Sequence, residues 1–373
     1  MKAELTLIPK ISIHPTRINY YQECNWNPGR PSKYKPSFER DYNSVSGDEN
    51  SNYSNRKFNH LLTSKRSASG MVSNIAKRKI SKALEYMLYL APGESMISKF
   101  TGRKWQFKVV FVTMTLSAKQ MHTDNEIKEK LLNQFLVECR KYYKVKNYVW
   151  RAEKQLNGSI HFHIVFDRHI PYEELRYKWN RIQKKLGYID EYRKRMEDWH
   201  KDGFQVRKDL LGKWNKQAQY NAWKKGVKTK WNDPNSTDVH SLRKVLNIKA
   251  YLTKYITKQP TGKNKLTGKE TLEEIKKIED EQKKLLVSGR IWGCSYELSD
   301  IKGCQLEIDN LVQNDLDKLF ESKKFNEYKG TYFTVTLASI ADIESAKCDL
   351  LIKKFMAYLL DTFGYSHQYK LSG

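Results

Sequence analysis

Two histidines separated by a single residue are the most specific chemical feature of this sequence. His161 and His163 flank Phe162 within residues 160–167, an apolar and β-branched run that is typical of a β-strand. Because residues two apart on a strand point to the same face, both imidazoles project together while Phe162 enters the core. Two neutral imidazoles at this spacing form half of a divalent-metal site, although they could also form a polar stripe on the solvent face of a half-buried sheet.

A third metal ligand is expected on the strand that precedes the histidines, residues 147–155. Glu153 and Gln155 lie there at a spacing of two, so they share one face of that strand. Both remain candidates, because a carboxylate and an amide oxygen can each bind a hard cation. In the register that we predict below, Glu153 lies opposite His163.

The turn between these two strands decides which residue lies opposite His161. Residues 156–159, Leu-Asn-Gly-Ser, are a strong hairpin signal. A two-residue turn at Asn157-Gly158 would place Lys154 opposite His161, where two groups that can both be cationic would meet. A three-residue turn that adds Ser159 places Gln155 there instead. We therefore predict the three-residue turn.

Two tyrosines and two lysines recur at helical spacing later in the chain. Tyr251 and Tyr255 are four residues apart and therefore share a helix face, and Lys254 and Lys258 each follow a tyrosine by three residues. A phenol has a pKa near 10 and is a weak nucleophile until a cation favours the phenolate. A neighbouring lysine can provide that charge or hold a scissile phosphate, and two tyrosines permit two successive cleavages. Alternatively, this is a solvated lysine-rich helix with half-buried tyrosines.

The remaining pattern places these residues on an α+β scaffold. Strands are predicted at residues 105–117, 147–155, 160–167 and 237–242, and helices at 123–143, 171–186 and 243–258, with helical pieces within 187–231. Thr123 or Asp124 is the expected N-cap of the first of these helices. Elsewhere the patterns predict a basic amphipathic helix at 71–91 that packs on the next domain, a linker at 43–55, a charged helix at 270–286, a strand within 329–337 and a helix at 342–363.

These elements divide the chain into three regions. Residues 1–100 form a basic and partly disordered N-terminal region with a helix near 71–91. Residues 101–260 form the domain that carries the histidines and the tyrosines, with a basic, Trp-rich insert near 187–235. Residues 261–373 form a C-terminal α/β accessory region.

The charge of the chain indicates a polyanionic partner. Among 373 residues, 68 are Lys or Arg and 42 are Asp or Glu, which leaves a net charge of +26. Such an excess attracts nucleic acid. No apolar run is long enough to cross a bilayer, and the first residues lack the apolar run of a secretory signal. Five scattered cysteines without a CxxC pair fit a reducing compartment. We therefore expect a cytoplasmic protein that does not bind a membrane.

The insert combines cations with aromatic side chains. Cations follow phosphates, and aromatic rings stack on unpaired bases. The residues that we expect to grip single-stranded DNA are Lys213, Trp214, Lys216, Trp223, Lys224, Lys225, Lys228 and Trp231. Alternatively, the tryptophans form a small core of the insert itself. The sequence has no P-loop and so no recognisable helicase or ATPase motif.

Three segments in order resemble the motifs of HUH endonucleases, which initiate rolling-circle replication. They are the strand 111–117 (FVTMTLS), the His161-Phe162-His163 strand and the helix 251–258 (YLTKYITK). The paired tyrosines with interposed lysines are most similar to the replication initiators of small single-stranded DNA phages (microviruses) and related plasmids. Residues 289–295 (GRIWGCS) are similar to a further stretch of that group, so the resemblance covers about residues 105–295.

The resemblance implies both a fold and a reaction. The fold would be a central antiparallel sheet of about five strands with flanking helices, extended by largely helical N- and C-terminal additions. Mg²⁺ or Mn²⁺ would bind His161, His163 and either Glu153 or Gln155. Tyr251 or Tyr255, assisted by Lys254 and Lys258, would attack a phosphate of single-stranded DNA. The products would be a 5′-phosphotyrosine and a free 3′-OH, and the reverse reaction would rejoin the strand.

The resemblance also implies partners and leaves alternatives. The DNA partner would be a single-stranded origin, expected to carry a stem-loop, and a host helicase and polymerase would complete replication in the host bacterial cytoplasm. The same chemistry would serve a conjugative relaxase or an HUH transposase. A non-catalytic basic nucleic-acid-binding protein on the same scaffold is the alternative from a different class.

Overall fold

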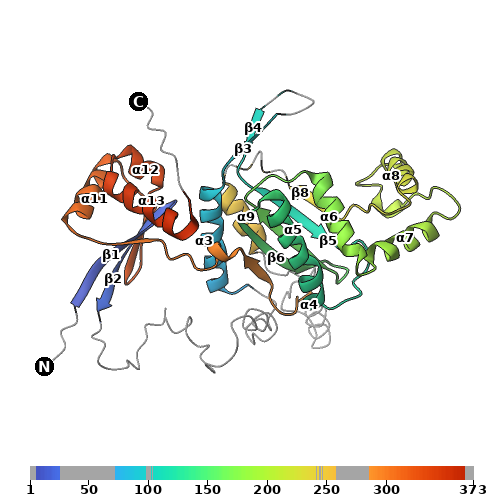
Figure 1. The fold of residues 1–373 in the computed structure, drawn as a ribbon, viewed down its shortest axis with the longest axis horizontal. Helices are drawn as coiled ribbons and strands as arrows, with labels where there is room; N and C mark the ends of the chain where they lie inside the picture. The colour runs from blue at the N-terminus through green and yellow to red at the C-terminus, as the bar shows by residue number, and fades with distance from the viewer. Residues whose placement is uncertain are drawn as a thin grey trace, which may run out of the picture. The chain divides into compact units, whose positions relative to one another are not determined.

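The computed structural model describes residues 6–25, 72–97, 102, 104–240, 242, 245, 247–257 and 285–365. Contacts divide the chain into two compact units, Met1–Phe58 with Asp300–Gly373, and Asn59–Ser299 (Figure 1). The linker expected at 43–55 and the helix expected at 270–286 lie outside the described residues. The region boundaries near residues 100 and 260 stay a prediction.

The larger unit, Asn59–Ser299, is built on a five-stranded antiparallel sheet. Its strand order is β8 (Thr237–His240), β5 (Val110–Thr115), β7 (Ile160–Phe166), β6 (Tyr148–Lys154) and β9 (Trp292–Cys294). Branched and aromatic side chains favour this pleated and half-buried geometry. The α+β class and the central five-stranded sheet expected from the sequence are therefore confirmed.

One face of this sheet packs against helices. Phe162 and Phe166 are fully buried on that face, and they contact rings from α5 (Gln134–Tyr143) and α6 (Tyr172–Lys184). Phe135 of α5 and Trp179 of α6 meet edge to face at 5.5 Å. Figure 1 shows both helices lying along the sheet. Burial of Phe162 here sends its neighbours on β7, the two histidines, to the opposite face.

Two predicted elements differ from the observed ones in detail. The predicted helix 123–143 contains α4 (Asp124–Ile127), a π-helical turn η2 (Lys128–Asn133) and α5; Thr123 is its N-cap and forms a capping box with Glu126. The single strand predicted at 105–117 is two strands. Its first part, β4 (Lys104–Phe107), pairs only with β3 (Glu94–Ile97), and β5 enters the central sheet after a bend at Lys108.

A third group of helices holds the tyrosine segment. The basic amphipathic helix predicted at 71–91 is α3 (Asn74–Leu90), and the predicted helix 243–258 is α9 (Ile248–Ile256). The two helices pack together, and Lys249 of α9 forms a 2.9 Å ion pair with the buried carboxylate of Glu85 on α3. The apolar side of α3 is therefore used for ordinary packing. The insert forms α7 (Tyr188–Trp199), η3 (Lys208–Leu210) and α8 (Lys216–Lys228), in agreement with the predicted helical pieces.

The second unit has a sheet of its own. Its antiparallel order is β10 (Cys304–Glu307), β1 (Thr6–His14), β2 (Arg17–Asn25), β12 (Phe333–Thr336) and β11 (Glu327–Lys329). The helices α11 (Asn310–Ser322), α12 (Ile340–Ser345) and α13 (Asp349–Phe363) accompany it. The largely helical additions expected from the sequence thus contain a second five-stranded sheet, and the strands β1 and β2 were not predicted.

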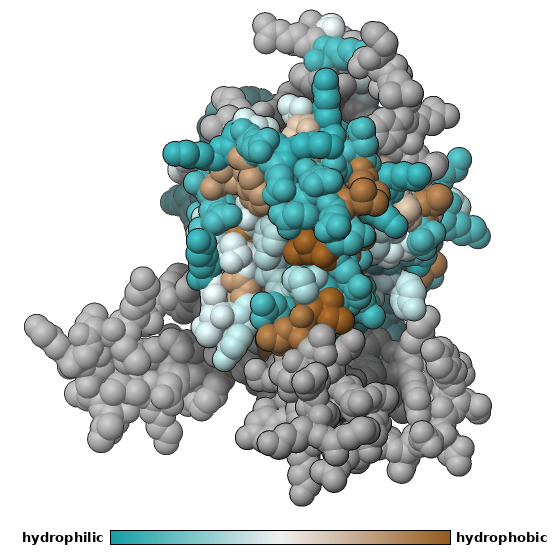
Figure 2. Space-filling model, turned by 90° about the vertical axis from the view of Figure 1, so that its left-hand side faces the viewer, coloured by the Kyte–Doolittle hydropathy of each residue, from teal (hydrophilic) through white to brown (hydrophobic). Residues whose placement is uncertain are grey.

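The surface of the described chain is mostly polar. Figure 2 shows hydrophilic residues covering most of the displayed face, with smaller hydrophobic areas between them. Such isolated apolar residues are normal on a protein surface. Within the described ranges, the helices are all too short or too polar to span a membrane.

A buried carboxylate joins the histidine hairpin to two other segments. Asp124 accepts a 2.5 Å bond from Lys154 at the end of β6 and further bonds from Gln120 and from the backbone N–H of Ser288. Both ionic partners are at most 10% exposed. Breaking such a pair leaves an uncompensated buried charge, so Asp124→Ala is expected to lower the free energy of unfolding by about 3–5 kcal/mol.

Denaturant unfolding of the purified protein measures this loss. Glu126→Ala is the matched control, because it removes only an exposed capping interaction within the same turn of helix and is expected to cost about 1 kcal/mol. Equal stabilities for the two variants would show that the Asp124 network does not hold these segments together.

Candidate metal centre and tyrosine pair

The hairpin turn has the predicted length but begins one residue earlier. The loop is Leu156-Asn157-Gly158, closed by a 2.8 Å bond from the N–H of Gln155 to the carbonyl of Ser159. A three-residue hairpin loop needs a left-handed residue at its last position. Gly158 provides it with a φ of 80°. The prediction had placed Gly158 in the middle of the turn, where this geometry is not needed.

This shift changes the cross-strand partners but not the faces. Glu153 lies opposite His161, and Arg151 lies opposite His163. The predicted pairs, Gln155 with His161 and Glu153 with His163, are therefore wrong. Gln155 follows the end of β6, two residues beyond the position opposite His161. Because the error is two residues, Glu153 still shares a face with both histidines.

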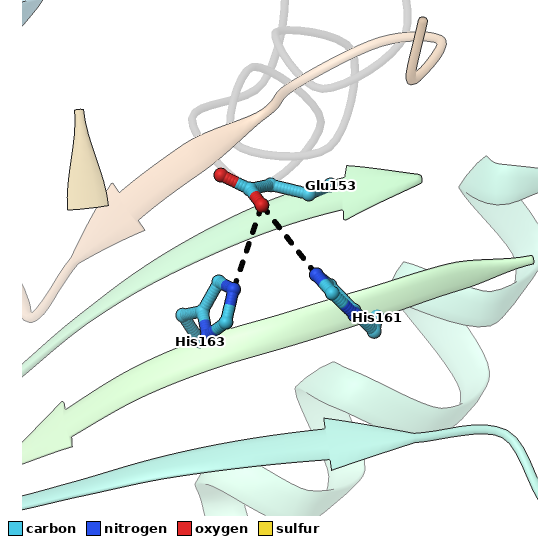
Figure 3. A group of neighbouring side chains, drawn as sticks. All are labelled: Glu153, His161 and His163. Carbon is cyan, nitrogen blue, oxygen red and sulfur yellow. Dashed lines mark ion pairs between the residues drawn. The ribbon is translucent and has the colours of Figure 1, made fainter. Parts of the chain in front are cut away.

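The carboxylate of Glu153 and the two imidazoles converge. The Oε2 atom of Glu153 is 3.5 Å from the Nε2 atoms of both His161 and His163. One potential ligand atom from each residue lies within 4.8 Å of the others. Figure 3 shows the carboxylate, which comes from β6, facing both rings on β7. One acidic oxygen and two imidazole nitrogens in this arrangement can hold a divalent cation.

Burial and charge keep this cluster in the protonation state that a metal needs. All three side chains are between 13% and 19% exposed. Burial alone would raise the pKa of Glu153, but hydrogen bonds from both histidines and the charges of His163 and Arg151 lower it to about 2. Burial also lowers the pKa of His163, and His161 adds to that shift. A carboxylate and a neutral imidazole are the metal-binding forms of these groups.

Unsatisfied polar atoms support the fit of a metal to this cluster. Both ring nitrogens of His161 and the Oε1 atom of Glu153 are buried without a hydrogen-bond partner among the described residues. Buried polar atoms in native proteins usually have partners. A cation bound by these atoms would satisfy an imidazole nitrogen and the carboxylate at once.

Sequence reasoning missed two residues that border the cluster. His240 on β8 had been treated as a surface residue, but its Nε2 lies 2.6 Å from Oγ1 of Thr113, and that oxygen lies 2.9 Å from Nδ1 of His163. Arg151 is 1% exposed, and its Nε is 3.8 Å from Oε1 of Glu153. The available signal was parity: each stands two residues from, or directly opposite, a residue of the same sheet face.

The tyrosine pair lies on the same side of the sheet as the cluster. The rings of Tyr251 and Tyr255 are 4.6 Å apart, as the spacing predicted. Both contact the ring of Phe111 on β5, with centroids 6.4 and 6.2 Å away, and Phe111 also contacts His163 at 5.7 Å. Phe111 thus adjoins both groups.

The two lysines of the tyrosine helix differ in what can be said of them. Lys254 is exposed, and its Nζ lies 5.9 Å from the ring centroid of Tyr255. Lys258 lies outside the described residues. Burial and the neighbouring Tyr255 hold the pKa of Tyr251 above its ordinary value. Tyr251 therefore remains a neutral phenol at physiological pH until a further charge arrives.

The insert places its tryptophans in two different environments. Trp223 and Trp231 join an aromatic cluster with His200, and the His200 and Trp231 rings stack in parallel at 5.2 Å. Trp231 lies directly over Gly226, where an added Cβ would be 1.9 Å from the ring. These two tryptophans therefore form the small core that was the alternative interpretation. Trp214 is 46% exposed.

The cations that we predicted to grip DNA are on the surface of the insert. The exposed members of the predicted set are Lys213, Trp214, Lys216, Lys224, Lys225 and Lys228. Lys225 lies 3.6 Å from the carboxylate of Asp233, so part of its charge is compensated within the protein. The remaining four lysines carry the net charge of this surface.

Comparison with known proteins supports this interpretation of the segments. No curated protein and no solved structure matches the chain at a significant level. Residues 109–260 match the family model of the replication-associated protein ORF2. That span includes β5, the histidine hairpin, the insert and the tyrosine helix. The match supports a role for this chain in DNA replication, as a replication initiator.

Proposed function

We propose that this protein nicks and rejoins single-stranded DNA at a replication origin through a covalent 5′-phosphotyrosine, in a metal-dependent rolling-circle mechanism. The observation that carries the proposal is the convergence of two sets of groups on Phe111. On one side is the cluster of Glu153, His161 and His163, and on the other are Tyr251 and Tyr255. A phosphate in this region would be within reach of a nucleophile and a metal together, as phosphoryl transfer requires.

Glu153, His161 and His163 would hold Mg²⁺ or Mn²⁺. When bound, the cation would polarise the phosphate and orient it for attack. Two neutral imidazoles and one carboxylate contribute a charge of only −1, so the loaded site would stay positive and would attract the DNA backbone. The buried Arg151 adds a further positive charge next to Glu153.

The covalent step would exchange one ester for another. The phenol oxygen of a tyrosine bonds to phosphorus, and the bond from phosphorus to the 3′ oxygen breaks. The phenol loses its proton, and the departing 3′ oxygen takes one up, leaving a free 3′-OH that can prime synthesis. Because the phosphodiester energy is kept in the phosphotyrosine, a 3′-OH can later attack it and restore both the DNA strand and the tyrosine.

The lysines of the insert would hold the DNA strand beside the site. We expect the triple variant Lys213→Ala, Lys216→Ala, Lys224→Ala to bind a single-stranded oligonucleotide less tightly. The slope of log affinity against log salt should become shallower by about 2, at ~0.7 for each phosphate that a lysine no longer neutralises. Fluorescence anisotropy across a series of salt concentrations measures both quantities.

Equal removal of charge in the other unit is the control for this variant. Lys318, Lys323 and Lys329 each form an ion pair with an acidic side chain, so their substitution should change the slope less. If both triple variants shift the slope equally, binding depends on total charge, and the insert has no special role.

An adduct assay tests the proposed function directly. The protein is incubated with Mn²⁺ or Mg²⁺ and 5′- or 3′-labelled single-stranded oligonucleotides from phage and plasmid origins. A denaturing gel should then show protein joined to the fragment that lies 3′ of the nick, and a free 3′-OH on the other fragment. DNA binding without any adduct, on all the origins tried, would favour the non-catalytic alternative.

A further inference from the structure

A hydrogen-bonded chain crosses three strands next to the candidate metal centre. The Nδ1 atom of His163 on β7 lies 2.9 Å from Oγ1 of Thr113 on β5, and this oxygen lies 2.6 Å from Nε2 of His240 on β8. The His240 ring stacks on Phe111 at 4.6 Å. Its other nitrogen, Nδ1, lies 3.9 Å from the carboxylate of Asp238. The chain therefore has a fixed geometry and a defined end.

The number of protons along this chain gives it a direction. A threonine hydroxyl has one proton, so it can donate to only one of its two imidazole neighbours and must accept from the other. Nε2 of His163, the atom that faces Glu153, can bind a cation only without a proton. The proton of a neutral His163 must then be on Nδ1, which donates to Thr113. Thr113 in turn donates to Nε2 of His240.

The reverse direction would block the metal. If Nε2 of His240 carried a proton, it would donate to Thr113, and the hydroxyl would donate to Nδ1 of His163. The proton of His163 would then be on Nε2, at the position of the cation. The carboxylate of Asp238 opposes this arrangement, because it favours a proton on Nδ1 of His240 and leaves Nε2 as an acceptor.

We propose that Thr113 and His240 are positioning residues that set the tautomer of His163, so that its Nε2 is available to a divalent cation. The inference rests on the proposed function, because it assumes that the cluster binds a metal. It adds a role for two residues outside that cluster. Loss of a group that bonds a metal-binding histidine typically weakens metal affinity by about 10–100-fold.

Affinity for Mn²⁺ alone, measured by calorimetry without DNA, tests the first part. Thr113→Val keeps the shape of the side chain and removes its hydroxyl, and it is expected to weaken Mn²⁺ binding by about 10–100-fold. Thr113→Ser restores a hydroxyl and should bind nearly as tightly as the wild type. Thermal unfolding of each variant checks that the protein remains folded.

Thr115→Val is the matched control. Thr115 is on the same strand and face, and it lies opposite His161 as Thr113 lies opposite His163. Its hydroxyl donates to the carbonyl of Ser236 at 3.1 Å, and neither nitrogen of His161 has a hydrogen-bond partner among the residues that the structure describes. Its removal should leave the affinity for Mn²⁺ unchanged.

The direction of the chain has its own measurement. In the Mg²⁺-saturated protein labelled with ¹⁵N-histidine, the chemical shifts should show His240 with an unprotonated, hydrogen-bonded Nε2 and a protonated Nδ1. His240→Phe keeps the stacking on Phe111, and its affinity for Mn²⁺ should fall. A protonated Nε2 on His240 in the loaded wild type would overturn the proposed direction.

Two failures can be told apart. If the wild type binds Mn²⁺ and Thr113→Val binds it equally well, the positioning role is wrong and the metal centre stands. If the wild type binds neither Mn²⁺ nor Mg²⁺, the metal-dependent part of the proposed function fails, and this inference fails with it.

Discussion

Replacing Tyr251 and Tyr255 together with phenylalanine is expected to abolish the covalent protein–DNA adduct. The double variant keeps both rings, their contact with each other and their contacts with Phe111, and it loses only the two phenol oxygens. Without a phenol no ester to phosphorus can form, so the loss should be complete at any metal concentration. A denaturing gel with labelled origin DNA measures it.

The single variants should separate two roles. The phenol pKa of Tyr251 is raised by burial and by Tyr255, which means that two phenolates side by side are unfavourable. We therefore expect the tyrosines to act in succession rather than together. One of the two changes, Tyr251→Phe or Tyr255→Phe, should block the first cleavage, while the other should leave it and block strand transfer. If both single changes abolish the first cleavage equally, this division of roles is wrong.

A tyrosine outside the site provides the control. Tyr177 on α6 is 68% exposed, and Tyr177→Phe also removes one phenol oxygen from the same unit. It should form as much adduct as the wild type. A reduced yield from Tyr177→Phe would mean that loss of adduct does not report on the nucleophile.

Replacing His161 with alanine should remove metal binding with little loss of stability. His161 has no hydrogen-bond partner among the described residues, so its removal leaves no donor or acceptor unpaired. Its loss should weaken Mn²⁺ binding by more than the ~100-fold that a supporting hydrogen bond can cost, because a metal ligand itself is lost. Cleavage of origin DNA should fall in parallel. Calorimetry with Mn²⁺ and the adduct assay measure the two effects.

The choice of His161 over Glu153 is deliberate. Removing Glu153 would also take away the negative charge that lies beside the 1% exposed Arg151, and this would confuse stability with metal affinity. His122→Ala is the control, because His122 contacts Tyr188 and lies outside the cluster. Normal cleavage by His161→Ala at low Mn²⁺ concentration would contradict the metal centre that we propose.

The hairpin illustrates how far local rules reach. The alternation of a strand and the three-residue length of the turn were predictable, because both follow from backbone geometry near the site. The position of the turn was not, since it depends on which residue adopts the left-handed conformation, and Gly158 does so at the third position. The register therefore moved by two residues, and Glu153 came to lie opposite His161.

Two other features depend on residues far apart in the chain. Thr113 and His240 are separated by more than a hundred residues, and they meet because β5 pairs with β8. Likewise, Lys10 on β1 lies opposite Glu307 on β10, so an unpredicted N-terminal hairpin shares a sheet with a C-terminal strand. Strand partners at such separations are chosen by the packing of whole elements, which no local pattern records.

By itself, the sequence determined the chemical groups and their grouping on each element: two imidazoles on one strand face, a carboxylate on the neighbouring strand, and two phenols on one helix face. It determined them because a strand repeats every two residues and a helix every 3.6. Only the tertiary structure decided that these groups converge around Phe111, and that Thr113 and His240 complete the hydrogen bonding of His163. The physical reason is that such contacts form between elements, where burial of the sheet's two faces, rather than local periodicity, brings side chains together.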